Sequence, residues 1–185
     1  MRQNNVLKLT LVGMGIALNM MGAFIALNLR LPIYLDSIGT LMVAFLLGPI
    51  YGVATGLCGS VISGVTFDIF SLYFAPVQIF TGFLGGYLYK KDWLKGWKIP
   101  FGTFFMTIFV SFIGAVIAAY LFGGVTSSGS SYIVAFLSNI GVNKVVSVFI
   151  VQFLTDYLDK LVAVILVSTA IVTLPRSMAQ RIEGA

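Results

Sequence analysis

The chain has 185 residues, of which 59% are hydrophobic and only 9% are charged, with 11 Lys and Arg against 6 Asp and Glu. Soluble globular domains carry about 25% charged residues, so this composition excludes a soluble domain, and its apolar content excludes intrinsic disorder. There is no histidine and a single cysteine, Cys58, so an internal disulfide is impossible and a Cys/His metal site is not expected. The sequence therefore predicts an integral membrane protein.

Six apolar stretches predict six transmembrane helices. A spanning helix needs about 20 apolar residues, so the length allows roughly five to seven spans and no additional soluble domain. The helices are expected at about residues 6–29, 36–48, 50–66, 73–90, 100–122 and 145–174. The fold class is therefore an all-α, six-helix membrane bundle in which residues 1–185 form one transmembrane domain.

The segments around these helices complete the pattern. The first stretch is expected to be a span and not a cleaved signal peptide, because no small-residue cleavage site follows it. Residues 66–71 are expected to form a loop, whereas residues 132–140 are apolar but short and predict a re-entrant or interfacial helix. The second and third stretches are short and rich in glycine, which is typical of closely packed helices.

The distribution of Lys and Arg predicts that both termini face the cytoplasm, since cytoplasmic loops are enriched in these residues. Six spans place both termini and the loop after the fourth helix on the same side of the membrane. Eight of the Lys and Arg residues fall on that side: Arg2, Lys8, Lys90, Lys91, Lys95, Lys98, Arg176 and Arg181. The charges on or toward the other side balance to nearly zero, so the net charge of +5 is mainly a topology signal.

The last expected helix contains three ionisable residues within five positions. Gln152, Asp156 and Lys160 are spaced by four residues, and Asp159 lies three after Asp156, so they share one face. A central Asp or Lys costs about 2.5–3.5 kcal/mol in a membrane helix, so these groups must be paired or wet. They could form a structural ion pair that fixes the helix in the bundle, or one wall of a binding pocket.

The other candidate ligand contacts are polar residues in or beside the loops on the outer side. They are Arg30, Asp36, Tyr73, Gln78, Asn139, Asn143 and Lys144. Asp36 and the two Asn residues could equally be helix caps, and Arg30 could reach lipid headgroups. Nearby aromatic residues could form an interfacial belt or stack on a flat ligand: Tyr34, Phe67, Phe70, Tyr73 and Phe74. Polar groups confined to one side indicate a pocket open to that side, not a continuous ion path.

The first helix contains small residues at helical spacing, Gly13 with Ala17 and Gly22 with Ala26. Such faces let helices approach closely, either within the chain or against another membrane subunit. The sequence contains no Walker A loop, no nucleophile–His pair and no clear internal repeat, and nothing in it indicates an enzyme.

Over essentially its whole length, the chain resembles the substrate-binding S component of energy-coupling factor (ECF) vitamin transporters. The resemblance is carried by the size, the six helices, the basic loop after the fourth helix, the small face at Gly13 and Ala17, and the stretches 35–52 and 122–129. The family usually has Ala at both small positions of the first helix, and Gly13 departs from this.

The resemblance implies a multi-pass subunit of a bacterial or archaeal plasma membrane that is not an enzyme. It implies capture of a vitamin or vitamin precursor on the outer side, and association, at Gly13 and Ala17, with a transmembrane scaffold subunit and two ABC-type ATPases. The partners use ATP, and this chain is expected to bind no cofactor, metal or nucleic acid.

The substrate is less closely defined. Aromatic residues and charges of both signs favour a hydroxymethylpyrimidine or pyridoxine type of ligand. Pantothenate is the first alternative, because its carboxylate could pair with Arg30 or Lys144. Other vitamins, namely riboflavin, folate and cobalamin, are further alternatives. A stand-alone small carrier and a membrane ligand sensor remain alternative functions.

Overall fold

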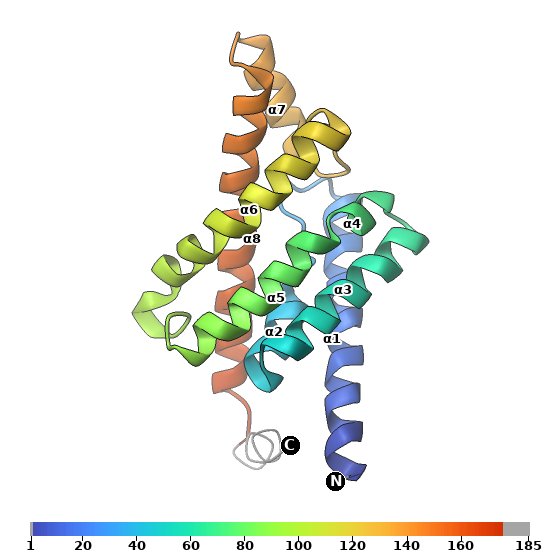
Figure 1. Ribbon diagram of the computed structural model, residues 1–185, viewed down its shortest axis with the longest axis vertical. Coiled ribbons are helices and arrows are strands. Elements are labelled where there is room, and N and C mark those ends of the chain that lie inside the picture. The colour runs from blue at the N-terminus through green and yellow to red at the C-terminus, as the bar shows by residue number, and fades with distance from the viewer. Residues whose placement is uncertain (1, 176–185) are drawn as a thin grey trace.

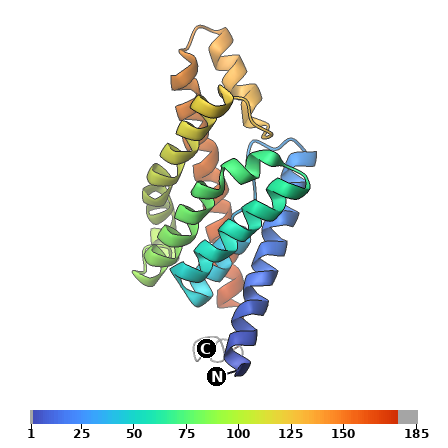
Figure 2. The ribbon, with the colours of Figure 1, turned by 45° about the vertical axis from the view of Figure 1, so that its right-hand side comes forward.

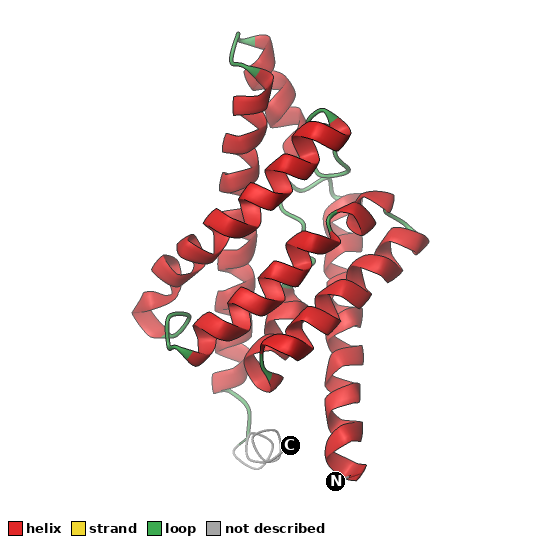
Figure 3. Ribbon diagram, in the orientation of Figure 1, coloured by secondary structure: helices red, strands yellow, loops and turns green. Residues whose placement is uncertain are grey.

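The computed structural model describes residues 2–175, which form helices connected by loops, with no strand among them (Figure 3). The elements in chain order are α1 (Arg2–Asn28), α2 (Ile38–Leu47), α3 (Pro49–Thr66), α4 (Ile69–Tyr73), α5 (Ala75–Lys90), the 3-10 helix η1 (Gly96–Lys98), α6 (Ile99–Phe122), α7 (Ser130–Asn139) and α8 (Lys144–Val172). Each of the six expected helices has a counterpart. Arg176 and Arg181, used above to predict topology, lie outside the described residues.

The two short helices α4 and α7 lie between the long ones. A loop was expected at residues 66–71, but α4 begins within it because Asp68 caps its first turn, with Oδ1 accepting a hydrogen bond from the backbone N–H of Phe70 at 3.3 Å. Helix α7 occupies most of the segment predicted to be a short helix, and it packs against α8.

The long helices alternate in direction along the chain (Figures 1 and 2). The first described residues of α1, the α5–α6 connection and the end of α8 lie toward one end of the molecule, here called the basic end. Four lysines lie in or beside the α5–α6 connection: Lys90, Lys91, Lys95 and Lys98. The α1–α2 connection, α4 and the α6–α7 connection lie toward the opposite end, here called the loop end.

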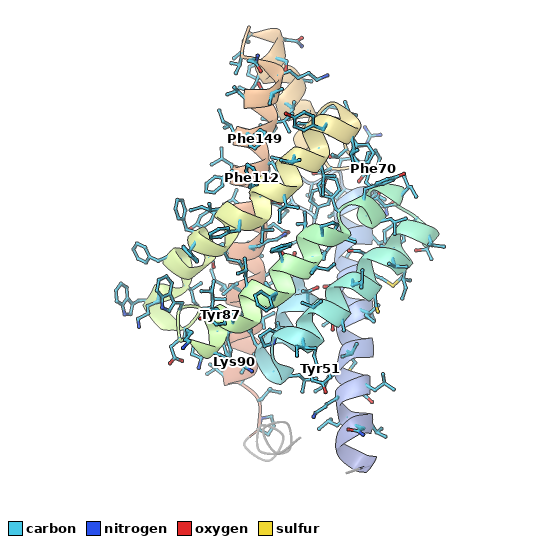
Figure 4. The ribbon with its side chains drawn as sticks, viewed as in Figure 1. Tyr51, Phe70, Tyr87, Lys90, Phe112 and Phe149 are labelled. Carbon is cyan, nitrogen blue, oxygen red and sulfur yellow. The ribbon has the colours of Figure 1, made fainter. Side chains whose placement is uncertain are left out.

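Among residues 2–175, three helical segments are long and apolar enough to cross a membrane: Asn5–Asn28, Pro49–Thr66 and Gly96–Phe122. Helix α2 has only 10 residues, which is about 15 Å of helix. The exterior of the bundle is strongly apolar, and Phe112 of α6 and Phe149 of α8 project outward with their ring centroids 6.1 Å apart (Figure 4). Such an exterior is stable in lipid, which identifies the chain as a membrane protein.

Glycines set the close approach of the helices at two crossings. A Cβ added to Gly39 of α2 would lie 1.8 Å from the carbonyl oxygen of Gly15 in α1. A Cβ added to Gly82 of α5 would lie 2.5 Å from the carbonyl carbon of Gly52 in α3. Both separations are far below contact distance, so only glycine fits, as is common where membrane helices pack backbone to backbone.

The connection between α1 and α2, here called the re-entrant loop (Leu29–Ser37), folds back into the bundle. A Cβ on Gly22 would lie 2.0 Å from the carbonyl oxygen of Leu35, although Gly22 lies six residues, or about 9 Å, before the end of α1. Irregular backbone at this depth is tolerated where protein groups satisfy its hydrogen bonds. This loop carries polar residues toward the middle of α8.

A neutral polar cluster fixes α1, α2 and α5 to one another. The Asn19 carbonyl oxygen accepts hydrogen bonds from the backbone N–H groups of Gly39 at 2.7 Å and Thr40 at 3.2 Å. The Asn19 amide donates to the Thr40 hydroxyl at 2.8 Å, and that hydroxyl donates to Gln78 Oε1 at 3.1 Å. Asn19, Thr40 and Gln78, here called the neutral cluster, are all buried.

Candidate functional site

A cavity lies between the re-entrant loop, α4, the first turn of α5 and the middle of α8. Its walls are formed by Tyr34, Asp36, Phe70, Ser71, Phe74, Val77, Gln78, Gln152, Asp156 and Lys160. The cavity has a volume of about 20 Å³, which is room for about one water molecule. The cavity is therefore narrow, and a larger ligand requires its loops or side chains to move apart.

One face of α8 supplies the polar base of the cavity. Gln152, Asp156 and Lys160 follow each other at four-residue spacing, which places them on successive turns of the same face. Asp156 is 2% exposed and Lys160 is 1% exposed, so both are removed from bulk solvent. A buried charge without partners is very unfavourable, so the arrangement of these groups decides their roles.

Asp159 is saturated with hydrogen-bond donors. Its Oδ1 accepts the backbone N–H of Leu35 at 2.7 Å, and its Oδ2 accepts the Lys160 ammonium at 2.9 Å and the Ser37 hydroxyl at 3.2 Å. Two of these three donors belong to the re-entrant loop. Asp159 therefore fixes that loop to α8 and balances the charge of Lys160.

Asp156 is only partly satisfied. Its Oδ2 accepts hydrogen bonds from the Ser111 hydroxyl at 2.9 Å and from the Gln152 amide at 3.0 Å. Its Oδ1 accepts no hydrogen bond from the described residues, and Asp156 lines the cavity. A carboxylate held in place through one oxygen with the other open is suited to receive a donor from a ligand.

Asp36 lines the cavity from the re-entrant loop. Its Oδ1 accepts a hydrogen bond from the Ser37 hydroxyl at 3.1 Å, but the same hydroxyl also lies 3.2 Å from Asp159. A hydroxyl has one proton, so the two carboxylates share this donor. Asp36 is thus a second carboxylate of the cavity that has fewer donors than it can accept.

Aromatic side chains enclose the cavity toward the loop end. The ring of Tyr34 lies 6.3 Å from that of Phe74, and the ring of Phe122 lies 4.7 Å from that of Phe70. Figure 4 places Phe70 on α4, close to the end of α6. Tyr34, Phe70 and Phe74 all line the cavity, so a flat ligand could pack against aromatic surface.

Hydrogen bonds join the re-entrant loop to the α6–α7 connection above the cavity. The Tyr34 hydroxyl donates to Thr126 at 2.9 Å, and the backbone N–H of Gly129 donates to the carbonyl oxygen of Leu31 at 3.0 Å. The Ser127 hydroxyl extends the contact to Asp68, beside α4, at 2.9 Å. These hydrogen bonds connect the loops that close the cavity toward the loop end.

The structure brings together five of the ten residues predicted to contact a ligand. They are Asp36, Gln78, Gln152, Asp156 and Lys160. The other five lie outside this cavity: Arg30, Tyr73, Asn139, Asn143 and Lys144.

Each of those five residues is exposed in the described part of the chain. Arg30 donates a hydrogen bond to the Tyr132 hydroxyl at 2.7 Å, and Tyr73 packs on Phe122 with ring centroids 5.3 Å apart. Asn143 is the N-cap of α8, with its Oδ1 accepting the backbone N–H of Val145 at 2.9 Å. Asn139 ends α7 and Lys144 begins α8, beyond the end of the cavity.

Some cavity residues were absent from the predicted contacts. Tyr34, Phe70 and Phe74 had been expected either to form an interfacial belt or to stack on a flat ligand, and they do line the cavity. Ser71 and Val77 carry no signal in the sequence. Neither does Ser111 of the apolar helix α6, whose hydroxyl donates a hydrogen bond to Asp156.

The two small-residue pairs of α1 face in different directions. Gly22 and Ala26 are buried against the rest of the bundle. Gly13 and Ala17 are exposed, and a Cβ added to Gly13 would meet nothing within 4 Å among the described residues. Gly22 and Ala26 therefore pack within the chain, whereas the Gly13–Ala17 face is left uncovered by the described residues.

A family model described as the ECF transporter substrate-specific component matches residues 7–176, which is most of the chain. Comparison with curated proteins gives no match, and neither does comparison with solved structures. The resemblance seen in the sequence is confirmed by the family match.

Proposed function

Since the chain belongs to the family of ECF transporter substrate-specific components, we propose that it captures a small organic solute in the cavity at the base of the re-entrant loop and delivers it inward. Members of this family are substrate-binding components of transporters and not enzymes. In the proposed arrangement the chain crosses the plasma membrane six times. Both termini and the basic end face the cytoplasm, and the loop end faces outward.

The observation that carries the proposal is the incompletely bonded carboxylate of Asp156 at the base of a narrow cavity. A membrane helix retains buried ionisable groups at a cost, and such groups mark substrate sites when they line a cavity. The lysines of the α5–α6 connection support the orientation, because they lie at the end opposite the cavity. The cavity therefore opens toward the side from which an importer takes its substrate.

Family membership implies that the chain associates with a scaffold subunit and ATPase subunits and that it binds a small-molecule substrate. We propose that the scaffold docks on the uncovered Gly13–Ala17 face of α1. Small residues there would let a partner helix approach closely, as they do at the glycine crossings inside this chain. ATP is used by the partner subunits in this scheme, and the chain itself binds no cofactor.

The proposed ligand is a vitamin or vitamin precursor of the hydroxymethylpyrimidine or pyridoxine type. Three aromatic side chains and the polar face of α8 support a flat, polar ring. Pantothenate, the alternative from the sequence, gains no support from the cavity lining, because Arg30 and Lys144 are not part of it.

Copurification and uptake test the proposed function together. The tagged chain is expected to bring down a scaffold subunit and two ATPases, and uptake in cells is expected to require ATP hydrolysis by those partners. Uptake by the purified chain alone in liposomes, driven by an ion gradient, would show a stand-alone carrier instead. If the chain binds a ligand but deletion of its gene leaves uptake of that ligand unchanged, the chain is a sensor.

The docking face has its own test. Ala17→Phe is expected to abolish copurification of the scaffold while ligand affinity and thermal stability stay at wild-type values, because Ala17 is exposed on α1. Ala26→Phe is the matched control, since Ala26 is buried and its enlargement should destabilise the chain itself. Normal assembly of Ala17→Phe would move the docking surface elsewhere.

A further inference from the structure

We infer that the cavity takes a small flat ring that presents hydrogen-bond donors or a positive charge, and that it rejects rings that carry a carboxylate or a phosphate. The inference rests on the proposed function, because it takes this cavity as the substrate site. It assigns a chemical class to the substrate from the charges and open hydrogen-bond positions that face the cavity.

Carboxyl groups outnumber cationic side chains at the base of the cavity. Asp36, Asp156 and Lys160 line it, and Asp159 stands directly behind Lys160, with 2.9 Å between Lys160 Nζ and Asp159 Oδ2. In the part of the chain that the structure describes, Lys160 is the only cationic side chain in the lining. An anionic ligand would therefore meet two carboxylates and one ammonium already paired with a third, where Coulomb repulsion is weakly screened.

Two carboxylates of the cavity lining have acceptor positions that the described residues leave open. Asp156 presents its open Oδ1, and Asp36 shares with Asp159 the single proton of Ser37. The Gln152 amide already donates to Asp156. A ligand that supplies donors would complete these carboxylates, whereas a ligand that supplies only acceptors would leave them unsatisfied.

The walls restrict the shape of the ligand. Tyr34, Phe70 and Phe74 present aromatic surface, and the space between the walls is narrow. A single flat ring fits such a site with less opening of the re-entrant loop than a branched chain does. A protonated nitrogen ring with a neighbouring amino group would offer a carboxylate two parallel N–H donors, as a guanidinium does.

The cations that could have received an anionic ligand lie elsewhere. Lys144 begins α8 and lies 12 residues, or about 18 Å of helix, before Asp156. Arg30 is exposed and donates to Tyr132, outside the cavity lining. Neither can neutralise a carboxylate at the base of the cavity.

Two matched pairs of probes test the inference on the purified full-length chain by isothermal titration calorimetry. Each pair keeps the ring and its other substituents and changes a hydroxymethyl group to a carboxylate: hydroxymethylpyrimidine with its carboxylic acid, and pyridoxine with pyridoxic acid. At least one hydroxymethyl compound is expected to bind, and its carboxylate counterpart is expected to bind at least ~10-fold more weakly, as for one lost charge-assisted hydrogen bond.

Asp156→Asn is expected to reduce the ratio between the affinities of the hydroxymethyl compound and its carboxylate. The substitution replaces a carboxylate that faces the cavity by a neutral amide, which repels an anionic ligand less. Asp36→Asn is the second variant, in case the first does not fold, and Asn143→Ala is the matched control outside the cavity. The inference is overturned if neither hydroxymethyl compound binds, if a carboxylate binds as tightly as its counterpart, or if both Asp variants fold and leave the ratio unchanged.

The proposed function is judged by a different result. Uptake that needs the partner ATPases would support it even if the ligand proved to be an anion, which would overturn only the substrate class. Uptake that does not need them would remove the proposed function whatever the probes show.

Discussion

Asp156 and Asp159 are three residues apart on the same helix and equally buried, yet their surroundings differ. Asp159 accepts three hydrogen bonds, from Leu35, Ser37 and Lys160. Asp156 accepts two on one oxygen and none from the described residues on the other. The difference separates a carboxylate that holds the fold from one that is available to a ligand.

The neutral cluster around Asn19 extends this comparison. Asn19 is 3% exposed and uses its amide oxygen and nitrogen on Gly39 and Thr40. It resembles Asp159 in being satisfied, and it lies outside the cavity. Burial and polarity alone therefore do not mark a binding residue, whereas an open hydrogen-bond position beside a cavity does.

The largest effect is expected for Asp159→Asn. Loss of the negative charge removes the hydrogen-bonded counter-ion of the buried Lys160 ammonium, and breaking such a pair costs about 3–5 kcal/mol. Unfolding by denaturant in mixed micelles would measure the loss. Asp159→Asn combined with Lys160→Met should recover part of it, because both charges are then removed. A single variant as stable as wild type would remove the distinction between the two aspartates.

A smaller loss of stability is expected for Asn19→Ala. The backbone N–H of Gly39 loses its acceptor, and each buried unsatisfied group costs about 1–3 kcal/mol. Ligand affinity should stay at the wild-type value in the fraction that folds, since Asn19 does not line the cavity. The same unfolding assay and a binding titration together measure this, and reduced affinity at normal stability would place Asn19 in the site.

Asp156→Asn should show the opposite pattern. The shape of the side chain is kept, so the free energy of unfolding should change by less than about 1 kcal/mol. Affinity should fall by about 1.5–3 kcal/mol, roughly 10- to 100-fold, through loss of a charge-assisted hydrogen bond. Calorimetric titration with the bound solute would measure it. Destabilisation as large as that of Asp159→Asn, with unchanged affinity, would make Asp156 structural.

The smallest effects are expected at the start of α8. Asn143→Ala removes an N-cap and should cost about 1 kcal/mol of stability, and Lys144→Ala should cost less. Affinity should change by less than about twofold in both, because neither residue lines the cavity. A clear loss of affinity in Lys144→Ala would return an anionic ligand to consideration.

The sequence predicts much of this arrangement because helical periodicity is a local property. Spacings of four residues were sufficient to place Gln152, Asp156 and Lys160 on one face of α8. The positions of the long helices follow from apolar stretches bounded by Gly, Pro and charged residues in the same way.

The sequence could not assign the two aspartates their different surroundings. That difference arises because the re-entrant loop returns to α8, and its path depends on the contact between Gly22 and Leu35 and on the hydrogen bond from Leu35 to Asp159. Neither contact follows from helical spacing, and the hydrogen bond joins residues that are 124 positions apart in the chain. For the same reason the sequence could not exclude Arg30 and Asn143. Both stand in polar segments beside the expected helices, yet both lie outside the cavity.

Mass spectrometry of small molecules that copurify with the chain and its variants tests the central claim most directly. A single organic solute should be retained by wild type and by Asn143→Ala, and it should be lost from Asp156→Asn although that variant keeps the wild-type melting temperature. Equal retention of the solute by folded Asp156→Asn, or loss of the solute from Asn143→Ala alone, would contradict the claim that this cavity is the substrate site.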